Sequence, residues 1–221
     1  MNERTETPRT QMIKAIFWDN DGVLVETEHL YFQATQRVLA SVGIPLTEEE
    51  YIDLFLVHGK GAWHLAEAYG IAPADIDRLR EERNALYSQC LTETPRVTAD
   101  ITKVLEALHG RYLMGIVTSS RRDHFDLIHR DTGLLKYFEF VLTAGDYRHS
   151  KPDPEPYLRA VERSGMSVEA CVAIEDSERG LQSATRAGLS CIVVPSALTR
   201  GSQFSSAYRV LGSVSEILSV L

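Results

Sequence analysis

The sequence predicts an α/β fold in which helices cover both faces of a parallel sheet. Short β-prone runs alternate along the chain with helical patterns, and acidic or hydroxyl residues follow several of these runs directly. Strands of a parallel sheet are buried on both faces and therefore read as nearly continuous apolar runs. One segment after the first run contains helical patterns only, which predicts a small all-helical cap inserted after the first strand.

The predicted strands are short apolar segments that end in polar residues. They lie at residues 13–18, 112–117, 138–142, 170–174 and 191–194. Helical patterns separate them. Residues 101–108 place apolar side chains at the i, i+3, i+4, i+7 spacing of one helical face, and residues 181–187 continue this pattern up to Gly188.

The inserted segment, residues 26–95, is the predicted cap domain, and residues 1–25 and 96–221 form the predicted core domain. Its helical patterns lie at residues 29–42, 48–56, 61–69 and 74–91. Linker-like residues Thr92 to Pro95 close the segment and its entry at Val25 to Thr27 is short, so the cap would move on two adjacent hinges. Because the segment follows the first strand, we expect it above the carboxyl edge of the sheet.

The composition is that of an acidic globular protein. The chain of 221 residues has 23 Lys+Arg and 31 Asp+Glu, a formal net charge of −8. It lacks the clustered basic residues with which nucleic-acid and membrane-surface proteins bind phosphates. No apolar run reaches membrane-spanning length, residues 1–11 lack a signal-peptide pattern, and the three cysteines suit reduced thiols. We expect a cytoplasmic monomer with no nucleic-acid or membrane partner.

Polar residues that carry chemistry stand at the ends of successive predicted strands. They are Asp19, Asp21, Thr118, Ser119, Lys151, Glu175 and Asp176. The carboxyl ends of parallel strands meet at one edge, where α/β proteins bind ligands, so these side chains should converge. Several carboxylates at one place need a hard cation such as Mg²⁺, whereas a lysine and a hydroxyl suit an oxygen-rich anion. The combination predicts phosphoryl transfer, in which an aspartate can itself attack phosphorus.

Taken singly, each of these features has an ordinary structural explanation. Asp, Asn and Gly are turn formers, so residues 19–22 alone predict a turn. An isolated loop lysine such as Lys151 is normally exposed to solvent. The order of these residues and their shared position at strand ends favour the functional interpretation, because turn formation requires neither.

The ordered motifs resemble those of the haloacid dehalogenase-like hydrolase superfamily. They are FWDNDGVL at 17–24, VTSS at 117–120, KPDP at 151–154 and IEDSERG at 174–180. The resemblance spans nearly the whole chain and implies a Rossmann-like core with a small cap of the C1 type. Residues 199–207 are similar to the phosphatase and beta-phosphoglucomutase-like branch of this superfamily.

The resemblance implies a Mg²⁺-dependent phosphatase of a small phosphorylated metabolite, such as a sugar phosphate or phosphoglycolate. Asp19 would be the nucleophile that forms an aspartyl phosphate, and Asp21 would be the general acid and base. The metal ligands would be Asp19, the backbone carbonyl of Asp21, Asp176 and Glu175. The groups that bind phosphoryl oxygens would be Thr118, Lys151 and the backbone N–H groups near Asn20, Asp21 and Ser119.

Alternative functions stay open at this point. A beta-phosphoglucomutase-like mutase would share these motifs, but members of that branch carry a histidine where this chain has Tyr31, which favours hydrolysis. A dehalogenase would need neither Asp21 nor Asp176. A phospho-accepting receiver-like signalling module also combines acids, a hydroxyl and a lysine on a parallel sheet. Receivers, however, place the phospho-acceptor on a middle strand and lack a long helical insert.

The candidate substrate residues of the cap are Arg83, Lys60 and His58. Arg83 lies on the apolar stripe of the helix predicted at 74–91, where it would reach the substrate, snorkel to solvent or pair with an acid of the core. His58 and Lys60 belong to a glycine-flanked loop that suits either substrate contact or an ordinary helix–helix turn.

The other histidines are expected at the surface. The pair Arg121-Arg122 is also expected there, with contact to the substrate as the alternative. The histidines lack the spacing of metal ligands, and the arginines stand at a predicted helix start. These histidines are His29, His64, His109, His124, His129 and His149.

Overall fold

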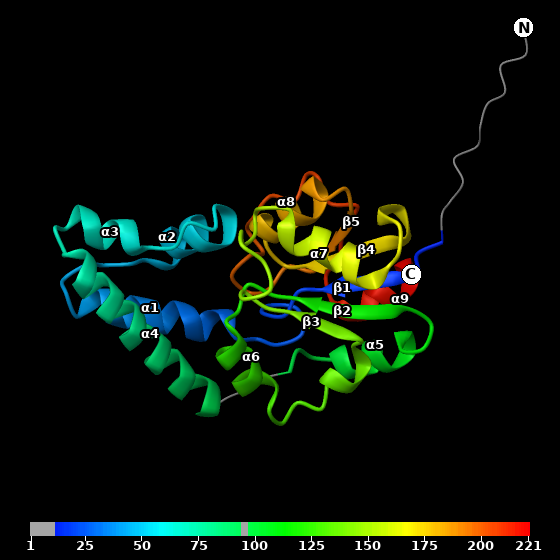
Figure 1. The fold of residues 1–221 in the computed structure, drawn as a ribbon, viewed down its shortest axis with the longest axis horizontal. Helices are drawn as coiled ribbons and strands as arrows, with labels where there is room; N and C mark the ends of the chain where they lie inside the picture. Colours follow the sequence, from blue (N-terminus) through cyan, green and yellow to red (C-terminus); the bar gives the residue numbers. More distant parts are fainter. Residues whose placement is uncertain (1–11, 94–96) are drawn as a thin grey trace, which may run out of the picture.

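A six-stranded parallel sheet forms the core, and the first strand of the chain is one of its inner strands (Figure 1). The computed structural model describes residues 12–93 and 97–221, and the strand order is β3-β2-β1-β4-β5-β6. The strands are β1 (Ala15–Trp18), β2 (Leu113–Val117), β3 (Phe140–Leu142), β4 (Cys171–Glu175), β5 (Ser190–Val193) and β6 (Arg209–Val210). The predicted strands are confirmed, whereas β6, an exposed pair of residues at the sheet edge, is not foreshadowed by the sequence pattern.

Strand β1 shows why the strands read as continuous apolar runs. Ile16 and Trp18 pack in the hydrophobic cluster on one face of the sheet, and Ala15 and Phe17 pack in the cluster on the other. All of them are fully buried. The alternation of side chains along a strand therefore separates two apolar faces rather than an apolar face from a polar one.

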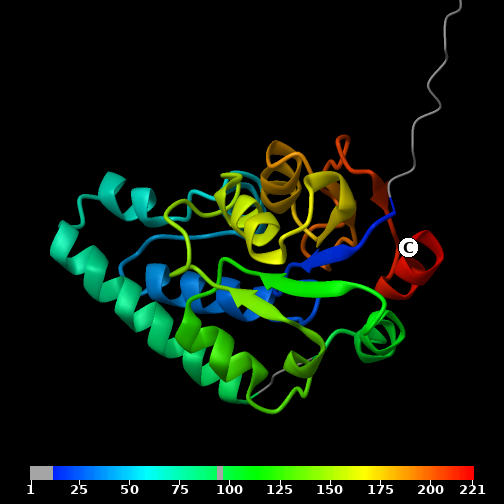
Figure 2. The same cartoon turned by 45° about the vertical axis from the view of Figure 1, so that its right-hand side comes forward.

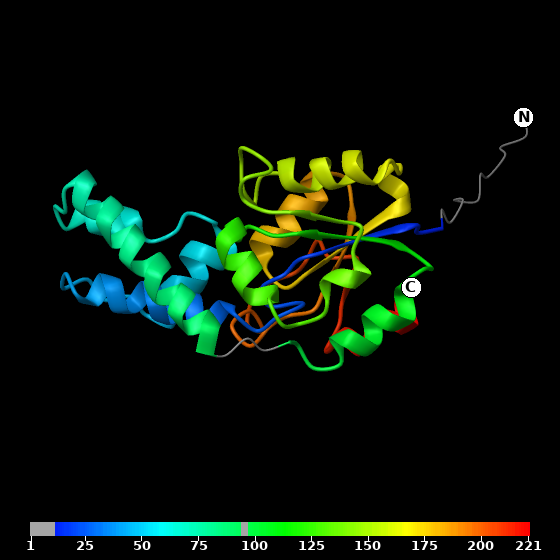
Figure 3. The ribbon, with the colours of Figure 1, turned by 60° about the horizontal axis from the view of Figure 1, so that its bottom comes forward.

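Helices cover both faces of the sheet, as predicted (Figures 2 and 3). One face carries α5 (Ile101–Leu108), α6 (Arg122–His129) and α9 (Ile217–Val220), and the other carries α7 (Glu155–Ser164) and α8 (Glu178–Arg186). Short 3₁₀ turns are η2 (Leu135–Tyr137), η3 (Val168–Ala170) and η4 (Val214–Glu216). Within the described ranges, no helix is both long and apolar enough to cross a bilayer. The three cysteines are free thiols, as expected.

The segment after β1 is helical throughout and extends from one end of the sheet (Figure 1). Its elements are α1 (Glu28–Ala40), α2 (Glu48–Tyr51), the π-helical η1 (Ile52–Val57), α3 (Trp63–Ala68) and α4 (Pro73–Glu93). The helix predicted at 48–56 is therefore a short α-helix that widens into a π-helix. The segment has a hydrophobic cluster of its own, which includes Leu39, Tyr51, Leu56 and Ile76. We call it the helical insert.

The helical insert also packs on the core, and its two ends are adjacent. Leu30 of α1 and Tyr87 of α4 belong to the hydrophobic cluster of the sheet, and α4 packs against α6. Val25 pairs with Val97 in an isolated antiparallel bridge, so the chain leaves the core and returns to it at one place. Of the predicted linker, Thr92 and Glu93 end α4, while Thr94 and Pro95 lie outside the described residues. The domain boundaries at 25/26 and 95/96 stay a prediction.

Candidate active site

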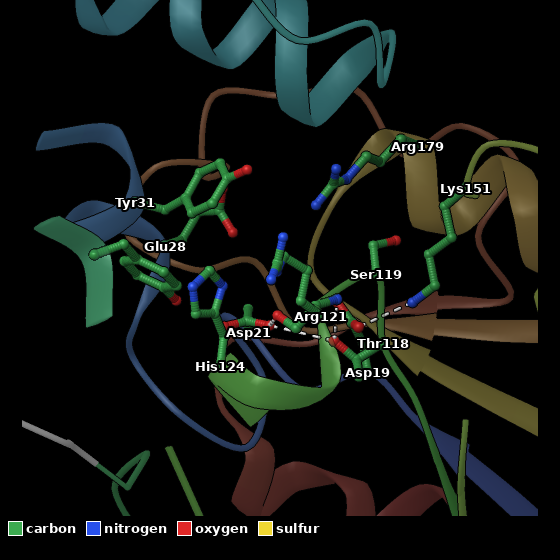
Figure 4. Close-up of a pocket in the computed structure, with 12 residues that line it drawn as sticks. Asp19, Asp21, Glu28, Tyr31, Thr118, Ser119, Arg121, His124, Lys151 and Arg179 are labelled. Atoms are coloured by element: carbon green, nitrogen blue, oxygen red, sulfur yellow. Dashed lines mark hydrogen bonds and ion pairs between the residues drawn. The ribbon is translucent and has the colours of Figure 1, made fainter. Parts of the chain in front are cut away.

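A cavity lies at the carboxyl edge of the sheet, between the strand ends and the helical insert (Figure 4). Asp19 and Asp21 reach it from the end of β1, Thr118 and Ser119 from the end of β2, and Lys151 from the loop after β3. The structure thus brings these predicted residues together although up to 132 positions separate them in the chain. The convergence follows from the parallel arrangement of the strands.

Lys151 lies at the base of the site and is almost fully buried. Its Nζ donates to Asp19 Oδ1 at 2.9 Å, to Glu175 Oε1 at 2.7 Å and to the Val117 carbonyl at 2.8 Å. All three ammonium protons are therefore used. Burial lowers the pKa of Lys151, but the charges of Asp19 and Glu175 outweigh burial and hold the pKa above its ordinary value.

Three buried carboxylates gather around this lysine. The carboxylate oxygens of Asp19, Glu175 and Asp176 lie within 4.8 Å of one another. Burial, together with the charge of Glu175, raises the pKa of Asp19 to about 7 even though Lys151 lowers it. Burial and the charges of Asp19 and Glu175 raise the pKa of Asp176 well above its ordinary value. Lys151 alone does not neutralise this group of acids.

Two glycines make the close packing of these acids possible. Gly22 has a positive φ of 89°, and a Cβ atom there would lie 2.1 Å from Asp176 Oδ2. A Cβ atom on Gly180, in the first turn of α8, would lie 1.9 Å from Glu175 Oε2. Any side chain at either position would displace a carboxylate of the site.

Hydroxyl and amide donors fix the carboxylate of Asp21. Ser120 Oγ donates to Asp21 Oδ2 at 2.7 Å, and Thr27 Oγ1 donates to Oδ1 in a short hydrogen bond. Thr118 Oγ1 and Asn20 Nδ2 each lie 3.3 Å from Oδ2. Asp21 is therefore oriented by donors from the segments that follow β1 and β2 and from Thr27 at the start of α1.

The structure corrects the expectation that His124 and His129 lie at the surface, since both are buried on α6. His129 Nε2 lies 2.7 Å from Asn20 Oδ1. His124 lines the cavity, and its ring packs edge-on against the ring of Tyr87. The amphipathic spacing of α6, with Phe125 and Ile128 on its buried face, was the sequence signal for this burial. By contrast, His64, His109 and His149 are exposed and His29 is half-buried.

The upper wall of the cavity contains residues that are not among the predicted site residues. Glu28 and Tyr31 come from α1, Tyr87 from α4 and Arg179 from the first turn of α8. Glu28 accepts a short hydrogen bond from the hydroxyl of Tyr51. Glu28 and Tyr31 are one helical turn apart on α1, which is the only sequence signal that places them on one face.

Arg121 also lines the cavity, whereas Arg122 does not. Arg121 pairs with Asp123, with two hydrogen bonds of 3.0 and 2.8 Å, and Arg122 pairs with Asp126 at 3.0 Å. The side chains of both arginines are mostly exposed, as expected.

The structure places the predicted cap residues outside the cavity wall. Arg83 is buried behind Tyr31, with its guanidinium carbon 4.4 Å from the ring centroid, and its Nε donates to Asn84 Oδ1 at 3.0 Å. His58 and Lys60 are exposed, and His58 pairs with Asp53 at 3.3 Å.

The loop that carries His58 and Lys60 does contact the core. A Cβ atom on Gly59 would lie 2.7 Å from the Lys151 carbonyl oxygen, so the loop packs directly on the segment that carries the buried lysine.

Comparison with known proteins identifies the family. A family model described as haloacid dehalogenase-like hydrolase matches residues 16–194, which include the sheet edge and the helical insert. The chain belongs to this family. A phosphorylated carbohydrates phosphatase of Thermotoga maritima is 34% identical over 217 residues, which cover 95% of this chain and 98% of that protein. The fructose-1-phosphate phosphatase YqaB of Escherichia coli is 29% identical over 183 residues, covering 81% of this chain and 95% of that protein.

A solved structure agrees with this assignment. The crystal structure of CbbY from Rhodobacter sphaeroides in complex with phosphate matches with a TM-score of 0.79 at 28% identity, and the match covers 93% of this chain and 96% of that chain. The haloacid dehalogenase-like hydrolase described here is thus an enzyme of the phosphatase and beta-phosphoglucomutase-like branch, and not a receiver-like signalling module.

The donor set of this hydrolase fits a hard divalent cation. Asp19, Glu175 and Asp176 offer only oxygen atoms. Burial and the neighbouring carboxylate charges raise the pKa of Asp19 and of Asp176, and Asp176 Oδ2 is buried with no hydrogen-bond partner among the described residues. An oxygen-ligated divalent ion would supply the missing positive charge and the missing partner.

Proposed function

We propose that this enzyme is a Mg²⁺-dependent phosphatase that hydrolyses a small phosphorylated metabolite through an aspartyl phosphate on Asp19. The observation that carries the proposal is the contact of 2.9 Å between Lys151 Nζ and Asp19 Oδ1 in a cavity that Asp21, Thr118 and Ser119 also line. The lysine holds a carboxylate nucleophile in place and offers positive charge where phosphoryl oxygens would gather. The phosphatase names of relatives that match 95% and 81% of the chain support the reaction class.

The reaction needs two displacements at phosphorus. In the first, an Asp19 oxygen bonds to phosphorus, the ester P–O bond breaks, and the leaving oxygen takes a proton from the carboxyl group of Asp21. In the second, Asp21 takes a proton from water as the water oxygen bonds to phosphorus, and the bond to Asp19 breaks to release phosphate. Thr118 and Ser119 are positioned to donate to the phosphoryl oxygens during both displacements.

Asp19, Asp176 and Glu175 would hold the Mg²⁺ ion, with the backbone carbonyl of Asp21 as a further ligand. Bound Mg²⁺ would neutralise the phosphoryl oxygens and the crowded carboxylates. The remaining ligands would be water and substrate oxygens, because Mg²⁺ usually keeps several waters.

Phosphate release from a panel of phosphate monoesters, with and without Mg²⁺, tests this function. We expect activity only with the metal, and none in Asp19→Asn, which keeps the size of the side chain but lacks the nucleophilic carboxylate. Mass analysis of an acid-quenched reaction should find phosphate on the peptide that contains Asp19. Wild-type turnover without Mg²⁺, or full turnover by Asp19→Asn, would overturn the proposal.

A second assay separates hydrolysis from mutase turnover. With beta-glucose 1-phosphate as the only substrate, we expect free phosphate rather than glucose 6-phosphate, because Tyr31 occupies the wall of the cavity where a mutase of this branch carries a histidine. The monomeric state and the cytoplasmic location also stay predictions, which light scattering and cell fractionation would check.

A further inference from the structure

Arg179 is a cation of the cavity wall that the proposed chemistry does not use. It stands in the first turn of α8, and its side chain extends toward the part of the cavity occupied by Tyr31 and Glu28 (Figure 4). Its Nε is buried and has no hydrogen-bond partner among the described residues. Its guanidinium also forms no ion pair within 4.0 Å in residues 12–93 and 97–221. A buried donor in this state is costly unless a ligand satisfies it.

Glu28 provides an acceptor on the opposite wall. It lies in the first turn of α1, and the hydroxyl of Tyr51, at the end of α2, holds one of its oxygens. Burial raises the pKa of Glu28, while the charge of Arg179 opposes that rise, so the two groups interact through space without touching. The space between them belongs to the same cavity as Asp19 and Lys151.

The two walls therefore offer opposite hydrogen-bonding roles beside the reacting group. Arg179 has only donors, and an ionised Glu28 has only acceptors. A hydroxyl group can accept from the first and donate to the second, and vicinal hydroxyls can engage both. A second anionic group, such as the carboxylate of phosphoglycolate, would gain the attraction of Arg179 but would face Glu28, Asp19 and Asp21 at short range.

We propose that Arg179, with Glu28 opposite, is a specificity-determining pair that binds the hydroxyl groups of a neutral polyol attached to the reacting phosphate. The inference rests on the proposed function and narrows its substrate class to sugar phosphates rather than phosphoglycolate. Arg179 acts on the leaving group and not on phosphorus, since Lys151 and the strand-end hydroxyls already line the position of the phosphoryl group.

The test compares substrates that share the phosphate and differ in the leaving group. Wild type, Arg179→Gln and Glu28→Gln are assayed with a hexose monophosphate, with phosphoglycolate and with phenyl phosphate, which has no hydroxyls on the leaving group. We expect wild type to prefer the hexose phosphate. In Arg179→Gln the ratio of kcat/KM for hexose phosphate to that for phenyl phosphate should fall about tenfold to a hundredfold, because a buried charged donor is lost.

Matched variants keep the result interpretable. Arg159→Gln removes an exposed arginine of α7 that pairs with Glu162, and it should leave every ratio unchanged. Arg179→Lys keeps the charge but loses the planar fork, so it should recover only part of the hexose preference. Thermal unfolding of each variant shows whether a loss reflects folding, which would lower the activity on all substrates together.

Three results would overturn the inference. The first is an equal loss on hexose phosphate and phenyl phosphate in a folded Arg179→Gln, and the second is an unchanged ratio. The third is a wild-type preference for phosphoglycolate that Arg179→Gln abolishes, which would make the subsite anion-binding. None of these results contradicts the proposed function. That function would be contradicted by other results, namely if wild type hydrolyses no ester or if Asp19→Asn stays active.

Discussion

His129 and Asn20 are joined by a buried hydrogen bond of 2.7 Å between Nε2 and Oδ1. The other side-chain atom of Asn20, Nδ2, lies 3.3 Å from Asp21 Oδ2, and Thr132 Oγ1 lies 3.1 Å from His129 Nδ1. With Asn20 donating to Asp21, its oxygen must accept the Nε2 proton of a neutral His129. A line of polar contacts thus runs from α6 to Asp21, the proposed general acid and base, and Asn20 is its middle member.

This pair predicts how stability depends on pH. Burial lowers the pKa of His129 from 6.5 to about 4 in the folded protein. The unfolded chain therefore binds a proton first as the pH falls, so the contribution of His129 is present above pH 6.5 and is lost on acidification. Between pH 8 and pH 5 this loss is about 2 kcal/mol of unfolding free energy.

The measurement is a difference between two proteins, because Asp19 and Asp176 have raised pKa values and act in the opposite direction. Urea unfolding of wild type and His129→Gln, at pH 8 and pH 5, isolates the histidine, and the glutamine can still donate to Asn20. The stability advantage of wild type over the variant should shrink as the pH falls. An advantage that stays constant, or grows in acid, would contradict the neutral buried state of His129.

Replacing Lys151 by methionine should damage both activity and stability. The variant keeps the length and the apolar stem but leaves Asp19 and Glu175 without the cation that now contacts both. We expect kcat/KM to fall about a hundredfold or more, and the free energy of unfolding to fall by about 3 kcal/mol.

Lys103→Met is the matched control for this variant. Lys103 is exposed and pairs with Asp100 at 2.8 Å on the surface. Its loss should leave the unfolding free energy almost unchanged, because exposed ion pairs contribute little to stability. Steady-state kinetics and urea unfolding check both variants, and a Lys151→Met protein with wild-type kcat/KM would refute the role given to this lysine.

Adding a single methyl group to Gly180 should perturb the site. Glu175 is held by Lys151 and by the Tyr157 hydroxyl at 2.6 Å, so its carboxylate cannot easily retreat from a Cβ atom placed 1.9 Å away. Overpacking should lower the free energy of unfolding by about 2 kcal/mol. The higher helix propensity of alanine would offset only part of this loss. Gly201→Ala, where a Cβ atom meets nothing within 4 Å, is the control. Equal stabilities of the two variants would show that α8 shifts freely.

Arg83→Met tests how the helical insert acts on the substrate. Arg83 packs against the rings of Tyr31 and Trp63, at 4.4 and 5.4 Å from their centroids, and only Tyr31 lines the cavity. We expect a loss of about 1 kcal/mol of stability from the cation–π contacts, and a moderate rise in KM with little change in kcat. If the variant instead matches Asp19→Asn in losing turnover, Arg83 touches the substrate directly and is not a residue that positions Tyr31.

The convergence of the residues at the strand ends could be predicted, because all strands of a parallel sheet end at the same edge. Asp19, Thr118, Lys151 and Asp176 each follow a buried apolar run, and a parallel sheet gathers such positions at one edge. The edge strand β6 could not be predicted in this way, because two exposed residues leave no apolar pattern to detect.

The wall of the cavity was harder to predict, since it depends on how the helical insert meets the sheet. Arg179 and Glu28 stand in helix first turns, where charged side chains are usually solvated, and their place in the cavity wall depends on contacts between elements distant in sequence, such as that of Glu28 with Tyr51. The burial of His129 was hard to predict for the same reason. It depends on Asn20, a polar residue in a buried turn that needs a hydrogen-bond partner from another element.

The bridge between Val25 and Val97 would allow the helical insert to be exchanged for another segment. Because the backbone leaves and re-enters the core at neighbouring positions, a segment of another length or sequence could be grafted there with a small change in loop-closure entropy. The graft would have to keep the apolar side chains at Leu30 and Tyr87, which fill the core cluster. The insert's share of substrate choice, which includes Glu28, could then be re-engineered from one contiguous stretch of sequence, while Arg179 and the residues proposed to perform the reaction stay as they are.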